Sequence, residues 1–142
     1  MNRERAVQIA YFLLRFVVAL LFIQVGGSKL FGWFDVLPKA MFPAGHVSLM
    51  SQLGLAGVLE VFGGAAIMLG LFTRPVAFIL SGEMAVAYFQ GHQPHGTWPV
   101  QNQGMPAVLF CFIYLFMAAY GGGDWSLDAL LFRKRGNPAR MP

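Results

Sequence analysis

The chain has 142 residues, of which 57% are hydrophobic and only 11% are charged, and its mean hydropathy is +0.60. A typical soluble domain carries about 25% charged residues, so this composition argues against an ordinary soluble protein and predicts a single polytopic membrane domain over residues 1–142. The alternative is a subunit buried in a large complex. The net charge of +4 comes from basic chain ends, without a basic helix interleaved with aromatic residues. A nucleic-acid partner is therefore not expected.

Four apolar segments follow one another along the chain, and a membrane-spanning helix needs about 20 such residues. The third segment is short, and the connection before it, Thr73-Arg74-Pro75, is tight. A further stretch, at about 125–134, has the pattern of a short amphipathic helix at the membrane interface. The predicted fold is an all-α bundle of four transmembrane helices, at about 7–27, 47–72, 75–90 and 105–121.

Basic residues set the expected orientation, because they collect in the cytoplasmic segments of membrane proteins. If the N-terminus is inside, the opposite side holds only Lys29 and Lys39. We therefore expect a multi-pass protein of the cell inner (plasma) membrane with both termini cytoplasmic. The basic residues on the cytoplasmic side would be Arg3, Arg5, Arg74, Arg133, Lys134, Arg135 and Arg140.

Three ionisable residues interrupt the apolar segments: Arg15 in the first, Glu60 in the second and Glu83 in the third. An unpaired charge inside hydrocarbon costs between about 2.5 and well over 10 kcal/mol, so such groups face the bundle interior and are functional candidates. Counted from the inner helix ends, these residues and Tyr114 of the fourth segment lie about 10 to 18 Å deep. One polar side chain from each helix would thus share a layer.

The charges of this layer do not balance. Arg15 is expected to neutralise one glutamate through a bidentate contact, and burial favours the protonated form of the other. The functional interpretation is a carboxyl that donates or accepts a proton beside a bound ligand. The structural alternative is an arginine–glutamate clamp, with the spare glutamate hydrogen-bonded or facing a hydrated cavity. Small residues on the Glu60 face, Gly57 and Gly64, would let another helix approach closely.

The loop over residues 91–104 carries His92, His95 and Trp98. No carboxylate or cysteine in this loop completes a metal site, so no metal is expected. The histidines are either solvated or able to donate a hydrogen bond to a quinone carbonyl. Lys29, after the first helix, either reaches outward to the interface or lines a ligand site beneath the outer loops.

Five motifs occur along the chain: Arg15, Gly27-Ser28-Lys29-Leu30-Phe31-Gly32, Leu59-Glu60-Val61-Phe62-Gly63-Gly64, Leu69-Gly70-Leu71-Phe72-Thr73-Arg74 and Gly123-Asp124-Trp125-Ser126-Leu127-Asp128-Ala129-Leu130. Together they resemble the DoxX family of small four-helix membrane proteins. The resemblance implies an inner-membrane protein, and some relatives are linked to quinone-dependent sulfur oxidation or to membrane oxidoreductase assemblies. Arg15, Lys29 and Glu60 match polar positions of the family.

The leading hypothesis is a membrane component of a redox system that binds a quinone or a similar lipophilic carrier, without an intrinsic cofactor. Its rival is a non-catalytic accessory subunit of a larger membrane complex, and a transporter of a small acid is a third option. The sequence leaves open whether the chain is an enzyme. Partners are expected to be the bilayer and other membrane subunits or further copies of the chain. The candidate catalytic residues are Glu60 and Glu83, and the candidate ligand-binding residues are Arg15, Lys29, Tyr114, His92 and Trp98.

Overall fold

The structure is a computed structural model that describes residues 2–132, and every regular element in this part of the chain is helical. The basic residues Arg133, Lys134, Arg135 and Arg140 lie outside the described residues, as do the last two residues of the predicted interfacial helix. The α-helices are α1 (Arg3–Phe31), α2 (Gln52–Val58), α3 (Gly64–Leu69), α4 (Thr73–Ala87), α5 (Met105–Tyr120) and α6 (Leu127–Phe132). Two π-helical segments, η2 (Leu59–Gly63) and η3 (Tyr88–His92), and two 3-10 turns, η1 (Trp33–Asp35) and η4 (Gln93–His95), complete the list.

The first helix is longer than its apolar run, because its ends are set by capping. The Asn2 side chain accepts a hydrogen bond from the Arg5 backbone N–H at 2.9 Å, which starts the helix before the apolar residues begin. Gly32 ends it with a positive φ of 69°, a conformation that glycine adopts without steric cost. The 29-residue helix therefore exceeds the predicted span of 7–27 at both ends.

The second helical segment runs from α2 through η2 to α3 and starts later than predicted. Ser51 caps it by accepting from the Gly54 N–H at 3.0 Å, so the helix begins at Gln52 instead of residue 47. Gly70, at a φ of 67°, ends it before the predicted limit of residue 72. The backbone stays helical throughout, but the hydrogen-bonding pattern widens to a π-helix over Leu59–Gly63.

The third and fourth helices form a hairpin. Both oxygens of the Asp128 carboxylate cap the start of α4, accepting from the N–H groups of Phe72 at 2.7 Å and Thr73 at 2.8 Å. At its other end η3 prolongs α4 to His92, two residues beyond the prediction. α5 agrees with the predicted fourth span to within one residue.

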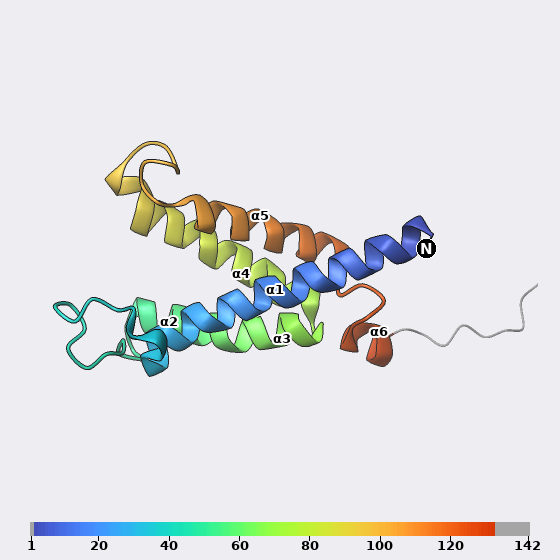
Figure 1. Cartoon of the computed structure of the whole chain (residues 1–142), viewed down its shortest axis with the longest axis horizontal. Helices are drawn as coiled ribbons and strands as arrows, with labels where there is room; N and C mark the ends of the chain where they lie inside the picture. The colour runs from blue at the N-terminus through green and yellow to red at the C-terminus, as the bar shows by residue number, and fades with distance from the viewer. Residues whose placement is uncertain (1, 133–142) are drawn as a thin grey trace, which may run out of the picture.

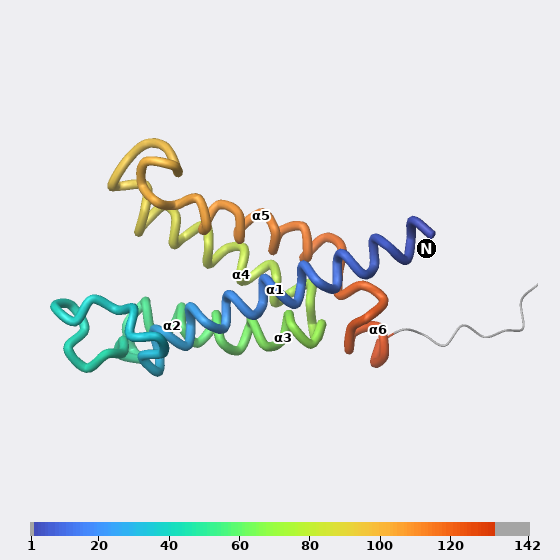
Figure 2. The backbone as a smooth tube through the Cα atoms, viewed as in Figure 1, coloured from blue at the N-terminus to red at the C-terminus, as the bar shows by residue number. Residues whose placement is uncertain are grey.

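The helices form two pairs that meet at one end of the molecule and diverge at the other (Figure 1). α1 packs against the α2–η2–α3 run and α4 against α5, as the backbone trace also makes clear (Figure 2). We call the end with residues 70–74 and 121–132 the Arg15 end, and the opposite end, with residues 32–51 and 93–104, the loop end. The buried core comprises Tyr11, Val18, Ala19, Phe22, Ile67, Ala77, Leu80, Met84, Ala107, Tyr114 and Met117.

Glycines allow α1 and the second helical segment to approach closely. A Cβ added to Gly26 would lie 2.7 Å from the carbonyl oxygen of Gly57 and 2.8 Å from the Cβ of Glu60. A Cβ added to Gly64 would lie 2.9 Å from Ile23. The small residues predicted on the Glu60 face thus pack against another helix, as expected, and that helix is α1.

Two helices in the described residues are long and apolar enough to cross a membrane, α1 and the run Gln52–Leu69. α5 is apolar but has 16 residues, about 24 Å at 1.5 Å per residue, against a hydrocarbon core of about 30 Å. α4 has 15 residues and is prolonged by the five of η3. The predicted all-helical fold is confirmed, and length and composition identify two of the four predicted spans.

Candidate functional site

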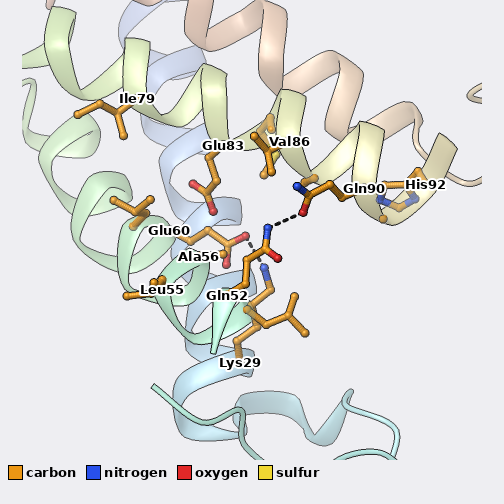
Figure 3. A pocket seen from close by; sticks show the side chains of 15 residues that line it. Lys29, Gln52, Leu55, Ala56, Glu60, Ile79, Glu83, Val86, Gln90 and His92 are labelled. Carbon is orange, nitrogen blue, oxygen red and sulfur yellow. Dashed lines mark hydrogen bonds and ion pairs between the residues drawn. The ribbon is translucent and has the colours of Figure 1, made fainter. Parts of the chain in front are cut away.

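A cavity of about 630 Å³ lies between the second helical segment and α4, on the side of the molecule where the two helix pairs diverge. Its walls are mainly aliphatic, and polar groups from five elements, α1, α2, η2, α4 and η3, converge on it (Figure 3). Pockets of this size and character accommodate small organic ligands. The lining residues are Lys29, Gln52, Leu53, Leu55, Ala56, Leu59, Glu60, Ile79, Glu83, Met84, Val86, Ala87, Gln90, Gly91 and His92.

An ion pair between Lys29 and Glu60 forms the polar centre of the cavity. The Lys29 Nζ lies 2.6 Å from the Glu60 Oε1, and Glu60 is 1% exposed while the Lys29 side chain is 20% exposed. Lys29 follows Gly26 by three residues and so lies on the same face of α1. That face packs closely against η2, because Gly26 has no side chain there. The pair leaves the Glu60 Oε2 buried and without a hydrogen-bond partner in the part of the chain that the structure describes. Lys29 therefore lines a cavity, and its role in binding a ligand there stays a prediction.

Both π-helical segments contribute to this cavity. η2 supplies Leu59 and Glu60, and η3 supplies Gln90, Gly91 and His92. A π turn inside an α-helix changes the direction of the following side chains and is often found at functional sites. No pattern in the sequence predicts such a turn, so these two π-helical segments were not expected.

Glu83 extends from α4 toward Glu60 across the cavity (Figure 3). Both of its carboxyl oxygens are buried and have no hydrogen-bond partner among residues 2–132. Tyr114 of α5 is fully buried and packs on Phe22 at 4.9 Å between ring centroids. Its hydroxyl has no hydrogen-bond partner in the same part of the chain and lies near enough to both glutamates for their charges to affect it. The structure thus brings together Glu60, Glu83 and Tyr114, three of the four residues of the predicted layer.

Arg15 does not belong to this cluster, and its predicted pairing with a glutamate is wrong. Its guanidinium donates hydrogen bonds to the backbone carbonyl oxygens of Gly122 and Trp125, the latter at 2.5 Å, and is 1% exposed. Glu60 packs level with Gly26, eleven residues and about 16 Å farther along α1. Depths counted from the helix ends suggested that Arg15 and Glu60 lie close together, but α1 extends past the end of α3. Arg15 lies at that end, where a Cβ on Gly70 would be 2.8 Å from the Arg15 Nη1.

The loop residues divide between the cavity and its surroundings. His92 lines the cavity, and its Nδ1 lies 3.1 Å from the Asn102 carbonyl oxygen. Trp98 is 65% exposed and is not among the lining residues. Asn102, which is 6% exposed, holds the loop by donating to the Gly96 carbonyl oxygen at 2.8 Å and accepting from the Gly104 N–H at 2.8 Å.

Two glutamines that the sequence did not single out also reach the cavity. The Gln52 side-chain amide donates to the Gln90 amide oxygen at 2.5 Å and links the two helix pairs near the loop end (Figure 3). The only signal in the sequence is that each glutamine occupies the end of an apolar run. Within residues 2–132, no group of three or more His, Cys, Asp and Glu side chains is arranged to hold a metal ion.

This arrangement can bind a small amphipathic molecule by two kinds of contact. The Lys29 ammonium has three N–H donors, of which Glu60 takes one. The Gln90 amide and the His92 ring, both from η3, add further hydrogen-bonding groups to the cavity. Leu59, Ile79 and other aliphatic side chains of the walls would contact an apolar ring or chain.

Sequence comparisons give the family. The DoxX family model matches residues 10–93, which include Lys29, Glu60 and Glu83. The chain is 40% identical over 129 residues to an uncharacterised protein of Haemophilus influenzae (strain ATCC 51907 / DSM 11121 / KW20 / Rd), covering 87% of this chain and 93% of that protein. It is 28% identical over 127 residues to inner membrane protein YqjF of Escherichia coli (strain K12), covering 84% and 90%.

No solved structure matches this chain significantly. The family match covers more than half of the chain, and the Haemophilus relative covers nearly all of it. The motifs Gly27–Gly32 and Leu59–Arg74, which suggested the resemblance, fall inside the matched residues. The chain therefore belongs to the DoxX family of membrane proteins.

Proposed function

We propose that this chain is a four-helix integral protein of the inner membrane and a component of a redox system, in which the cavity binds a quinone or a similar lipophilic carrier. The similarity to inner membrane protein YqjF of Escherichia coli supports the location. Both termini would be cytoplasmic. In support, Arg74 lies at the Arg15 end, which is also where α1 begins, while Lys29 and Lys39 lie toward the loop end.

One observation carries the proposal: an aliphatic cavity contains a buried ion pair that has hydrogen-bonding capacity left over. A quinone head group offers two carbonyl oxygens on opposite edges of a flat ring. Lys29 would donate to one carbonyl, and the Gln90 amide or the His92 ring to the other. The isoprenoid chain would leave between Leu59 and Ile79, both of which line the cavity and are exposed on its outer side.

Glu60 would act by holding the Lys29 ammonium toward the cavity, and Glu83 and Tyr114 would assist proton movement. A buried carboxylate that accepts a charge-assisted hydrogen bond fixes the position of the donor. The predicted role of Arg15 as a ligand-binding residue is not part of this proposal, because its donors point to the carbonyl groups at the opposite end. Trp98 is also left out, since it does not line the cavity.

Quinone binding tests this proposal directly. We would titrate the purified protein in lipid nanodiscs with decylubiquinone, follow the quenching of tryptophan fluorescence, and compare Glu60→Gln with the wild-type chain. Loss of the charge that holds Lys29 should weaken binding about tenfold. Glu4→Gln, an exposed carboxylate in the first turn of α1, is the matched control and should bind normally. If decylubiquinone shows no saturable binding, or binds Glu60→Gln as tightly as the wild-type chain, the proposal is refuted.

An accessory subunit without catalytic activity is the second candidate, and the turn after α1 favours it. Phe34 is 69% exposed there and adopts a positive φ of 65°, which is unfavourable for a side chain of this size. It lines an apolar groove together with Leu21, Val25 and Phe110. If this groove receives a membrane partner, Phe34→Ser should lower the apparent mass of the complex in native gels of solubilised membranes, and Glu60→Gln should leave it unchanged. An unchanged mass for Phe34→Ser would count against this role.

A further inference from the structure

The cavity contains one more negative group than positive groups. Three other titratable side chains line the cavity with Glu83: Lys29 from α1, Glu60 from η2 and His92 from η3. A fourth, Tyr114 of α5, lies in the buried core, near enough to Glu83 for its charge to affect it. Lys29 and Glu60 compensate each other at 2.6 Å. The carboxyl of Glu83 has no cation of its own among the described residues, and neither of its oxygens has a hydrogen-bond partner.

Low polarity makes this imbalance costly. A net charge at membrane depth is strongly unfavourable unless a counter-charge or water compensates it. Two carboxyls that face one another cannot both remain ionised beside a single ammonium group without such compensation. One unit of positive charge would cancel the surplus, and the candidates are a proton on Glu83 or a cation bound in the cavity.

The unpartnered oxygens indicate where that positive charge is held. Glu60 is only 1% exposed, yet its Oε2 has no hydrogen-bond partner among the described residues. The two Glu83 oxygens lie across the cavity from Glu60. The Tyr114 hydroxyl is also fully buried, has no hydrogen-bond partner among the described residues and lies near both carboxyls. These oxygens are free to accept a hydrogen bond or to contact a cation, while the aliphatic walls suit an apolar body.

We propose that the cavity binds lipophilic monocations, and that the cation replaces one proton held between Glu83 and Glu60. Without ligand, the Glu83 carboxyl carries the proton. When the cation binds, the O–H bond of Glu83 breaks, its electron pair stays on the carboxylate, and the proton is released to the buffer. The charge of the cavity is then the same before and after binding.

This ligand class is independent of quinone binding, because it depends on the surplus carboxyl and not on the Lys29 donors. The cavity volume of about 630 Å³ lies within the range of pockets that hold drug-sized molecules. Exposed aliphatic residues at its edge, Leu55, Ile79 and Val86, suit a ligand that arrives from the hydrocarbon phase. The occupant is therefore expected to partition into membranes.

Tetraphenylphosphonium is the probe, and tetraphenylborate is an anion of the same shape. Isothermal titration of the full chain in nanodiscs, in buffers of different ionisation enthalpy, measures the affinity and the protons released. We expect about one proton released per phosphonium bound, and a Kd that falls about tenfold for each unit of pH rise while the carboxyl holds its proton. Tetraphenylborate should bind no better than to empty nanodiscs.

Glu83→Gln should weaken phosphonium binding at least about tenfold and remove both the proton release and the pH dependence. Glu4→Gln is the control for the substitution itself, and an unchanged size-exclusion profile shows that Glu83→Gln folds. Equal binding of phosphonium and borate, or phosphonium binding without proton release, would overturn the inference. Binding of decylubiquinone but not of phosphonium would overturn it as well, and would leave the proposed quinone site standing.

Discussion

Replacing Lys29 with methionine tests the central contact of the cavity. The substitution keeps an unbranched apolar stem out to Cε, with a sulfur in place of the Cδ methylene, and removes the ammonium group. Glu60 is then left buried, facing Glu83, and no cation among residues 2–132 lies beside either carboxyl. We expect a clear loss of stability, because removal of one partner leaves an uncompensated buried charge.

The size of this loss follows from the burial of the pair. Removing one partner of a fully buried ion pair costs about 3–5 kcal/mol. Glu60 is almost completely buried, but the Lys29 side chain keeps 20% of its exposure, which lowers the cost. We therefore expect about 3 kcal/mol for Lys29→Met, at the lower end of that range. Glu60→Gln in the same background should restore much of it, because the double variant buries no unpaired charge at this position.

The assay is reversible unfolding of the purified protein in mixed micelles, with the four chains of a double-mutant cycle. The exposed pair Lys39–Asp35, with an N–O distance of 3.0 Å and side chains 75% and 68% exposed, is the internal control. Lys39→Met should cost less than about 1 kcal/mol, as exposed ion pairs usually do. If Lys29→Met costs no more than Lys39→Met, or if the cycle shows no coupling to Glu60, the reasoning on the buried pair is refuted.

Two further predictions concern the packing of the bundle. Gly26→Leu should destabilise the fold by about 1–3 kcal/mol, since the added side chain meets the second helix. Gly82→Leu, where a Cβ meets nothing within 4 Å, should be tolerated in the same unfolding assay. Arg15→Met should increase hydrogen exchange over residues 121–128, because two backbone carbonyls lose their donors, while ligand binding in the cavity stays unchanged. Arg74→Met, on an exposed side chain, is its control, and loss of ligand binding in Arg15→Met would contradict the separation of the two sites.

The sequence was a good guide to the helices and their contact faces. Apolar runs located the four helical segments, and the small residues around Glu60 marked a face that packs closely against a neighbour, found here to be α1. Helix ends were less well placed, because side-chain caps at Asn2 and Ser51 decide them. Hydrophobicity carries little information about such caps.

The site was predicted only in part, because its geometry depends on how the helices are aligned with each other. Depths counted from each helix end assume that the ends are level, whereas Arg3 lies twelve residues, or about 18 Å, before Arg15 along α1. Because of that offset, Glu60 pairs with Lys29 and not with Arg15. The π turns and the divergence of the two helix pairs, which create the cavity, are likewise results of packing and not of local sequence.

Arg15, which is buried, and Lys29, which is half-buried, have different consequences for function. Arg15 donates to backbone carbonyls, whose positions are fixed by the turn that follows α5, and it is almost inaccessible. A ligand could compete for it only by opening that turn. Lys29 is 20% exposed, donates one hydrogen bond to Glu60 and lines a cavity that also contains the Glu83 carboxyl. Exchange of a ligand or a proton is therefore possible at the loop end, while the Arg15 end serves to hold the helix pairs together.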